Sequence, residues 1–297
     1  MVTPEDAIER ISQAMGGRTG KRTLHAKGRF YSGTFTATPE ATALCRAAHL
    51  SGAPVPTMIR FSNGSGRVSA DRVPDVRGMA VSFRPAGGGA TDVLGQTAPR
   101  FPVPSPDEFV KFTRAAAAAR SKPWVLLGYL AAHPKAVPAI VVNGKAGAIK
   151  PPNSFAAATY YAVHAYKWLD ADGGSRWVRY TWLPDQDAAS ATPDRSDADY
   201  LFNELETRLK NGPVRMRLRV QVAADGEDPD DPMAVWKSKE HLDAGTLEIT
   251  APDPERETKG DIVVFDPTKV IDGIELSDDP ILRFRSPAYS ASVNRRV

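Results

Sequence analysis

Short apolar runs separated by turn residues dominate the first third of the chain. The runs lie at residues 30–35, 57–61, 79–83 and 92–94, and three consecutive glycines form one of the connectors. Short apolar runs bounded by glycine, proline and serine are typical of β-strands. The region from residue 25 to 103 is therefore predicted to be a series of strands.

The strand pattern returns in the second half of the chain. Further strands are predicted at residues 159–169, 176–183, 214–222, 246–250 and 262–265. The first two are rich in tyrosine and tryptophan and flank a glycine-containing turn, which indicates an antiparallel hairpin. Within the third, Arg215, Arg217 and Arg219 alternate with apolar residues and are expected to point outward.

Three stretches carry helix-start signals. Thr3-Pro4 precedes an amphipathic run that ends near residue 15. Ser105-Pro106 opens a helical section that extends to about residue 145, and Ser196 is the expected N-cap of a helix that ends near residue 209. A serine or threonine side chain at the N-cap satisfies one of the first backbone donors of a helix, and proline is well tolerated at its first position.

Many short strands interrupted by helical sections predict the α+β class, with one antiparallel β-barrel that carries helical insertions. No G-x-G-x-x-G sequence follows a predicted strand, which argues against a doubly wound parallel sheet. The chain contains no internal repeat and no long linker, so we expect a single domain over residues 1–297.

Composition narrows the classes of function. With 42% hydrophobic and 25% charged residues, the chain has the balance of a folded soluble protein. Its 38 Lys and Arg and 35 Asp and Glu are scattered rather than grouped in a basic stripe, so we expect no nucleic-acid partner. Cys45 is the only cysteine, which excludes an intramolecular disulfide and an all-cysteine metal site.

The sequence carries no pattern of a secretory signal at its start, so we expect a cytoplasmic protein. The most apolar stretch, residues 124–142, is interrupted by Pro134, Lys135 and Pro138 and differs from the run of about 20 apolar residues that a membrane span requires. We expect no membrane partner and expect this stretch to pack against the rest of the protein, which is predicted to be a monomer or a homodimer.

His25 is the candidate that stands out among the five histidines. It lies where a strand is predicted to begin, and Gly28 lets the backbone there pass close to another group. The remaining histidines have no His, Cys or carboxylate at metal-ligand spacing, and we interpret them as ordinary polar residues. They are His49, His133, His164 and His241.

Two further segments combine chemistry-bearing residues with regular patterns. Residues 58–64 and 71–81 are typical of a strand, a polar turn and a second strand. If the tail after residue 286 is helical, Arg285 and Tyr289 lie at i and i+4 on one face, where a guanidinium can reach a phenol oxygen. A surface Arg–Tyr pair is the simpler interpretation of this last pattern.

Taken in order, these segments resemble the haem catalase family over almost the whole chain. The matching motifs are residues 22–28, 60–62, 75–81, 92–99, 179–182 and 270–289. Each motif is weak alone, and their common order along the chain carries the resemblance.

The resemblance implies a minimal catalase core that binds haem b. Tyr289 would be the axial iron ligand, because ferric iron and Arg285 both favour the phenolate. On the other face of the haem, His25 would accept a proton from peroxide and deliver it to the departing oxygen. Ser62 matches the residue that orients this histidine.

The resemblance also assigns the remaining site residues. Arg22, Arg60 and Arg296 match positions that pair with the haem propionates, where guanidinium geometry suits carboxylates. Phe101 matches an apolar residue near the haem plane. Gln96 stands at the distal amide position, where the family has the shorter asparagine, and this difference is expected to reduce catalase turnover.

The sequence ends at Val297, directly after the haem segment, so we expect a minimal version of the fold that lacks the C-terminal helical domain of catalases. An accessible haem favours a peroxidase that reduces hydrogen peroxide or organic hydroperoxides with small organic electron donors, beside weak catalase activity. We expect no NADPH.

Two alternatives remain open at this point. The same core resembles allene oxide synthase, which rearranges fatty-acid hydroperoxides without an external reductant. A haem carrier or sensor without turnover is the alternative from another class. The alignment of His25 with Ser62 and Gln96 argues against a carrier, which needs no distal base.

Overall fold

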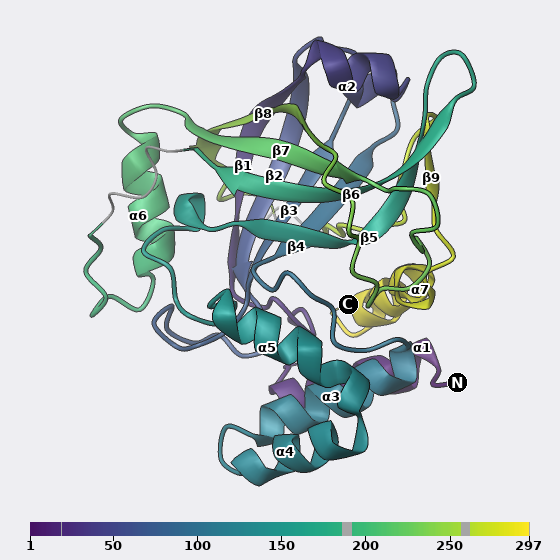
Figure 1. Ribbon diagram of the computed structural model, residues 1–297. Coiled ribbons are helices and arrows are strands. Elements are labelled where there is room, and N and C mark those ends of the chain that lie inside the picture. Colours follow the sequence, from purple (N-terminus) through teal and green to yellow (C-terminus); the bar gives the residue numbers. More distant parts are fainter. Residues whose placement is uncertain (19, 186–191, 257–261, 297) are drawn as a thin grey trace.

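A computed structural model describes residues 1–18, 20–185, 192–256 and 262–296 (Figure 1). The strands are β1 (Gly28–Ala37), β2 (Val55–Asn63), β3 (Arg77–Phe83), β4 (Thr91–Gln96), β5 (Tyr160–Leu169), β6 (Ser175–Pro184), β7 (Val214–Val222), β8 (His241–Pro252) and β9 (Ile274–Leu276). The α-helices are α1 (Pro4–Met15), α2 (Pro39–Leu44), α3 (Pro106–Ala118), α4 (Pro123–Ala132), α5 (Val137–Lys145), α6 (Tyr200–Leu209) and α7 (Pro280–Asn294). Short 3-10 helices are η1 (Ala48–Leu50), η2 (Pro134–Ala136) and η3 (Phe155–Ala157).

Eight of the described strands close into an antiparallel barrel, which confirms the predicted fold class. Consecutive strands from β1 to β8 are neighbours, and β8 pairs back with β1. The contact between β4 and β5 is a single pair, Gln96 with Tyr161, and β9 continues along β5. Register shifts place extra residues in β5 once and in β8 twice, and such bulges bend a strand, as barrel closure requires.

The barrel interior holds the main core. Trp168, Trp182 and Phe35 have no exposed surface, and the Trp168 indole donates to the Tyr180 hydroxyl at 2.7 Å. Burying aromatic side chains of this size supplies a large part of the hydrophobic stabilisation, and the hydrogen bond satisfies the indole donor. Cys45 lies at the edge of this core, where its thiol donates to the Gly273 carbonyl oxygen at 3.3 Å.

Helices cover the barrel from outside. Figure 1 shows α3, α4 and α5 below the barrel, α6 on its flank and both termini near α1 and α7. Ala7 and Ile11 of α1 pack with Val110 of α3, and Phe284 of α7 joins the same cluster. The predicted N-cap of α1 is confirmed, since the Thr3 side chain accepts from the Asp6 N–H at 3.2 Å.

The predicted start of one helix and one predicted strand are wrong. Ser196 lies in a turn and α6 begins at Tyr200, where the Leu201 N–H donates to a carboxylate oxygen of Asp71 at 3.0 Å. The helix start is thus satisfied by a residue 130 positions away. Residues 262–265 form no strand; they run in irregular conformation over β1, where Phe265 stacks on Phe30 with ring centroids 6.0 Å apart.

The expectation that residues 124–142 pack against the protein holds only in part: Tyr129 packs on Phe112 of α3 and Ala136 and Ala139 are buried, but most of the stretch is not. None of the side chains of α4 is buried, and Trp124 and Leu127 are 64% and 66% exposed. The segment is apolar on all sides of the helix, so its sequence resembles that of a buried helix although it lies on the surface. Within the described residues no single helix is long and apolar enough to cross a membrane, and α4 with residues 134–145 passes that test only as a pair bent by 108°.

Candidate active site

Two rows of side chains cross the outer face of β1 to β4. The first row consists of Gly28, Ser62, Gly78 and Gln96, which pair in register across the four strands. The second row consists of Phe30, Arg60, Ala80 and Leu94. Cross-strand partners share one face of a sheet, so this wall carries polar groups, small residues and apolar residues together.

His25 lies over the first row. Its Nδ1 is 2.9 Å from the Ser62 hydroxyl oxygen, and its backbone N–H donates to Gly64 at 3.0 Å. His25 has φ +56°, and among the described non-glycine residues it alone has a positive φ. A left-handed conformation costs on the order of 1–3 kcal/mol for such a residue and persists where the surroundings fix it, often at active sites.

The electrostatic surroundings keep the His25 imidazole neutral. Burial lowers the pKa of His25 to about 3, and the charges of Arg60, Arg285 and Arg22 add to this effect. A neutral imidazole can accept a proton at ordinary pH. Because Ser62 holds Nδ1, the Nε2 atom is the one left for a reactant.

Gly78 makes room for this histidine. A Cβ atom on Gly78 would lie 2.6 Å from Cε1 of His25 and 2.8 Å from the Ser62 hydroxyl oxygen, closer than real contacts allow. The preceding Arg77 is 1% exposed and donates to the carbonyl oxygens of Asp71 and Val73 at 2.7 and 3.0 Å. Arg77 therefore holds the loop that contains Asp71 and Val73, and Gly78 leaves room for the His25 imidazole.

Three of the predicted arginines surround the same region. Arg60 is 4% exposed, lies over the Phe30 ring at 5.5 Å and occupies the space that a Cβ on Gly28 would fill. Arg22 donates to the Val263 carbonyl oxygen at 2.8 Å. Both guanidinium groups act on the His25 pKa, as does Arg285. Arg296 follows the end of α7, where its N–H donates to Val293 at 2.7 Å.

Helix α7 carries Arg285 and Tyr289 one turn apart, as predicted. The charge of Arg285 lowers the pKa of Tyr289, but burial raises it by more, so the net direction is upward. Arg285 alone therefore does not hold the phenol ionised, and a bound cation has to supply the rest of the stabilisation. Arg22 also acts on the Tyr289 pKa, which places this phenol and the His25 imidazole near a shared guanidinium.

His164 is the residue that sequence reasoning missed. It lies at the register shift of β5 and its Nδ1 is 2.6 Å from an Asp279 carboxylate oxygen, with both side chains 1–2% exposed. The second Asp279 oxygen accepts from the N–H groups of Ile281 and Leu282, so Asp279 caps α7.

The interpretation of His164 as an ordinary polar residue is thus corrected, because its carboxylate partner is 115 residues away. Burial is the largest cause that lowers the His164 pKa, and Arg285 is among the nearby charges. The pair joins the barrel to the start of the helix that carries Tyr289. Asp279-Pro280 is an N-cap signature that the sequence does display.

Phe101 lies in an apolar cluster beside this pair. It is 6% exposed, stacks on Phe109 with centroids 5.5 Å apart and lies 6.3 Å from the His164 ring. Ile281, at the start of α7, belongs to the same cluster. Phe101 therefore packs the region between α3, β5 and α7.

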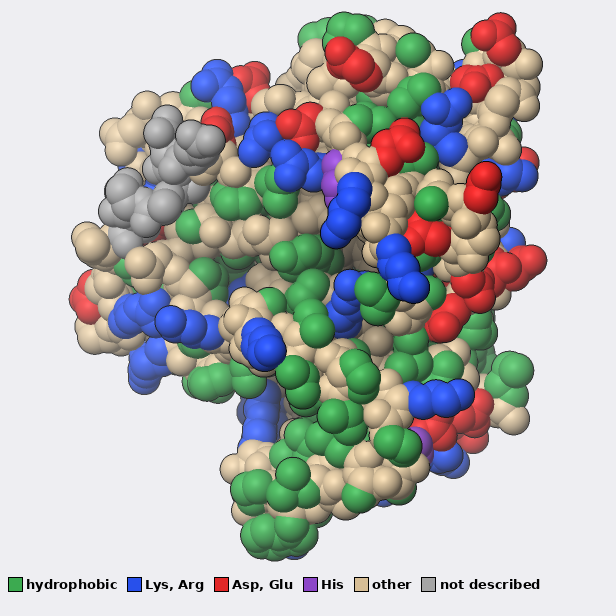
Figure 2. Space-filling model, in the orientation of Figure 1, with side chains coloured by type: hydrophobic (Ala, Val, Ile, Leu, Met, Phe, Trp, Pro, Cys, Tyr) green, Lys and Arg blue, Asp and Glu red, His purple; other side chains and the backbone are tan. Residues whose placement is uncertain are grey.

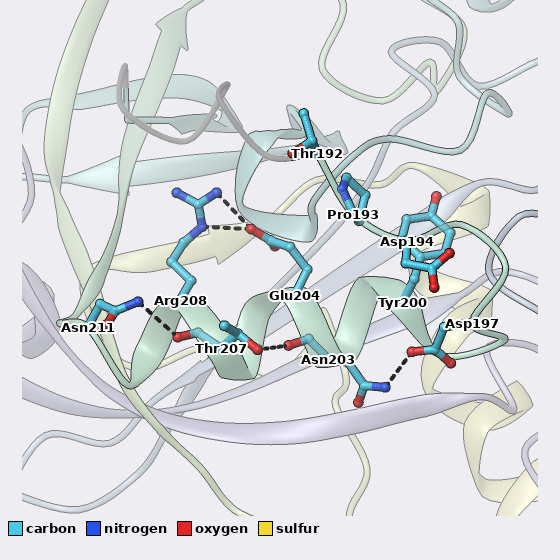
Figure 3. Close-up of a pocket in the computed structure, with 10 residues that line it drawn as sticks. All are labelled: Thr192, Pro193, Asp194, Asp197, Tyr200, Asn203, Glu204, Thr207, Arg208 and Asn211. Atoms are coloured by element: carbon cyan, nitrogen blue, oxygen red, sulfur yellow. Dashed lines mark hydrogen bonds and ion pairs between the residues drawn. The ribbon is translucent and has the colours of Figure 1, made fainter.

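A pocket of about 570 Å³ lies elsewhere, along α6 (Figure 3). Four of its polar side chains are engaged with one another: Arg208 pairs with Glu204 at 2.7 Å, and Asn203 donates to Asp197 at 2.6 Å. The residues that line this pocket lie between Thr192 and Asn211. They include none of the site residues named above.

The fold and the site together define a class of protein. A phenol on one helix, a neutral imidazole on the barrel wall and nearby guanidinium groups suit a flat iron macrocycle that carries carboxylates, as in haem proteins with tyrosinate ligation. An apolar cluster covers part of the same wall. Its members are Phe30, Met58, Ala80, Leu94, Val263 and Phe265.

Comparison with known proteins gives a consistent picture. The family model described as Catalase matches residues 2–297. The chain is 46% identical to a catalase-related peroxidase of Mycolicibacterium paratuberculosis over 100% of this chain and 95% of the relative. It is 29% identical to a catalase-related peroxidase of Synechococcus elongatus over 100% of this chain and 89% of the relative.

Solved structures show the same fold. A bacterial catalase matches with a TM-score of 0.78 at 20% identity, over 97% of this chain and 59% of that one. A fungal catalase matches with a TM-score of 0.79, also at 20% identity, over 98% of this chain and 62% of that one. The chain belongs to the catalase family. Membership implies a haem cofactor, and the residues present fit it, since Gly28 and Gly78 leave the space that Arg60 and His25 occupy.

Proposed function

We propose that this protein is a haem b peroxidase that reduces hydrogen peroxide or organic hydroperoxides and oxidises small organic donors. The observation that carries the proposal is the placement of a neutral His25, held by Ser62 over Gly78, on the wall that shares Arg22 and Arg285 with Tyr289. Two relatives of similar length bear the name catalase-related peroxidase, which supports the same reaction class.

The proposal gives each residue a role. Tyr289 would provide the phenolate ligand, and Arg285 one turn earlier would stabilise its negative charge. Arg22, Arg60 and Arg296 would bind the propionates. A bound haem supplies the iron chemistry that cleaves the O–O bond.

Proton movement is the task of the barrel wall. The Nε2 atom of His25 accepts the proton from one peroxide oxygen and returns it to the other, which then leaves as water or as an alcohol. The Ser62 hydroxyl keeps the ring in place at 2.9 Å during this transfer. Gln96 lies two strands from Ser62 in the same row, on the same face of the sheet.

The first experiment measures the absorption spectrum of haem-loaded protein and its reaction with each peroxide, with and without a phenolic donor, by stopped flow. We expect a tyrosinate-type ferric spectrum and donor-dependent turnover. Rapid oxygen evolution without a donor would instead make the protein a true catalase, and failure to bind haem would overturn the proposal.

Two substitutions separate the roles. His25→Ala should retain haem and lower the rate of peroxide reaction by about 10²–10⁴-fold, the usual contribution of a proton-transfer group. The matched control is His241→Ala, an exposed histidine at the start of β8. Native reactivity in His25→Ala would refute the proposed proton transfer and return the protein to a haem carrier or sensor.

Tyr289→Phe should lose haem or its tyrosinate spectrum, because phenylalanine cannot ligate iron. Tyr200→Phe is the control, since its hydroxyl donates to the Pro152 carbonyl oxygen beside α6. The rearrangement alternative is not favoured, and product analysis with a fatty-acid hydroperoxide tests it directly: reduction to an alcohol supports the peroxidase.

A further inference from the structure

Helix α4 is apolar all round and yet lies on the surface. Its sequence is Pro-Trp-Val-Leu-Leu-Gly-Tyr-Leu-Ala-Ala, and none of these side chains is buried. Helices of this composition normally lie in a protein core or in contact with lipid. Figure 2 shows the hydrophobic side chains gathered over the lowest lobe of the molecule, where Figure 1 places α4.

The neighbouring helix α5 extends the apolar surface. Val137, Val141 and Val142 are 38–48% exposed, and Ile149 shortly after the helix is 58% exposed. The two helices meet at an angle of 108°. Two helices joined at such an angle share a plane, so both can rest on one flat surface.

The charge of this region is mostly positive, although the Glu108 carboxylate of α3 contacts Tyr129 and His133 at its edge. Residues 109–169 contain no aspartate or glutamate, although the chain has 35 of them. The part from 109 to 150 carries exposed basic residues: Lys111, Arg114, Arg120, Lys122, Lys135, Lys145 and Lys150. Within the described residues only Lys111 of this group forms an ion pair, with Glu108. The net charge of the whole chain is +3, so this segment contains the positive excess.

We propose that α4, α5 and their flanking lysines form a docking surface for the face of a bilayer that contains anionic lipids. Apolar side chains and a tryptophan enter the headgroup region, and basic residues around them attract the negative surface. With ten and nine residues, α4 and α5 are too short to span a bilayer and lie along it.

The charge also distinguishes this occupant from a second copy of the chain. In a twofold symmetric dimer the same patch meets itself, so the lysines of one copy would face those of the other across an apolar contact. A negatively charged lipid surface complements both the apolar and the basic parts of the patch.

Vesicle sedimentation tests the proposal with the haem-loaded full chain. We expect binding to phosphatidylcholine vesicles with about 30% phosphatidylglycerol, little binding to pure phosphatidylcholine, and weaker binding as salt rises from about 0.1 to about 0.5 M. Equal binding to both vesicle types, or no binding to either, would overturn the proposal.

Variants locate the surface. Leu127→Glu should reduce vesicle binding at least tenfold, and it removes little packing because Leu127 is 66% exposed. The matched control Val235→Glu changes an apolar residue that is 57% exposed elsewhere and should bind as the unaltered protein does. Replacing Lys122, Lys135 and Lys145 together by Gln should abolish the preference for the anionic vesicles.

The readout does not depend on catalysis, so its failure is separate from failure of the proposed function. An unchanged haem spectrum in Leu127→Glu shows that the variant folds. If sedimentation velocity shows a dimer that Leu127→Glu dissociates, and vesicles do not bind, the patch joins two copies and the proposal is wrong.

Discussion

Two walls of the same barrel carry arginines on their outer faces and use them differently. On β7, Arg215, Arg217 and Arg219 have side chains 37–53% exposed, and each pairs with Glu248 or Asp243 of β8. On β2, Arg60 is 4% exposed and lies over the Phe30 ring, on which Phe265 of the covering segment also stacks. Arginines on the open wall are neutralised across the strands.

The positive charge on the covered wall acts instead on the site. Together with Arg22 and Arg285, Arg60 shifts the pKa of His25 downward. The comparison shows that the sheet geometry alone does not create the site. What creates it is the cover, formed by α7 and residues 262–266, which removes one wall from water.

The largest loss of stability should come from a substitution at Asp279, which attaches α7 to the barrel through His164. Asp279→Ala removes the cap of α7, which costs about 1 kcal/mol, and leaves the buried His164 imidazole without its hydrogen-bond partner, which costs about 1–3 kcal/mol more. Denaturant unfolding measures the loss. Asp279→Asn retains a good capping residue and should lose less, whereas Asp278→Ala, next to it on the surface, should change stability little. Equal effects at positions 278 and 279 would contradict this account.

The next effect concerns the row that holds His25. Gly78→Ala places a Cβ atom 2.6 Å from the imidazole, so the ring has to move. A displacement of about 1 Å lowers the rate by about 10²-fold, and stopped-flow peroxide reaction measures it. Haem binding should be retained. Gly128→Ala on α4, where a Cβ meets nothing within 4 Å, is the control. Native kinetics in Gly78→Ala would show that His25 is not confined by this wall.

Acid sensitivity is expected from the core as well as from the covered wall, because burial lowers the pKa of a histidine in each. Burial lowers the pKa of His49 to about 3, while an unfolded histidine titrates near 6.5. Between these values the unfolded chain binds a proton that the folded chain does not, so stability is full above pH 6.5 and falls as pH decreases. At pH 5 the loss from His49 is about 2 kcal/mol.

His49→Phe, which retains a ring against Phe83, should therefore lose less stability than the unaltered protein between pH 7 and pH 5. Denaturation at both pH values measures the difference. An unchanged pH dependence would assign the acid sensitivity to other groups.

The smallest effect is expected on the open wall. Arg217→Ala breaks an exposed ion pair with Asp243 and should change the free energy of unfolding by no more than about 0.5 kcal/mol.

Arg60→Ala should leave the barrel folded but weaken haem retention, measured by haem transfer to apomyoglobin. Similar haem retention in the two variants would remove the distinction between the walls.

The local patterns predicted most of the strands because alternation and turn chemistry act over a few residues. The caps Thr3 and Ser105, and the helix carrying Arg285 and Tyr289, were likewise visible in the sequence. The family resemblance selected His25, and the structure adds the reason: Ser62 and Gly78, which pair across β2 and β3, both lie against its imidazole.

What the sequence hid depends on contacts between distant residues. Asp71 caps α6 across 130 positions, and Asp279 meets His164 across 115, so no spacing rule reveals either. The surface position of α4 was hidden for a different reason. Hydropathy reports how apolar a helix is but not which surroundings cover it, and an apolar helix was therefore expected in the core.

The position of Cys45 has a consequence for durability. Its thiol is 1% exposed, and burial raises its pKa to about 11, so at pH 7 only about one molecule in 10⁴ carries the thiolate that peroxides attack. The single thiol of this protein is therefore expected to react slowly with peroxide.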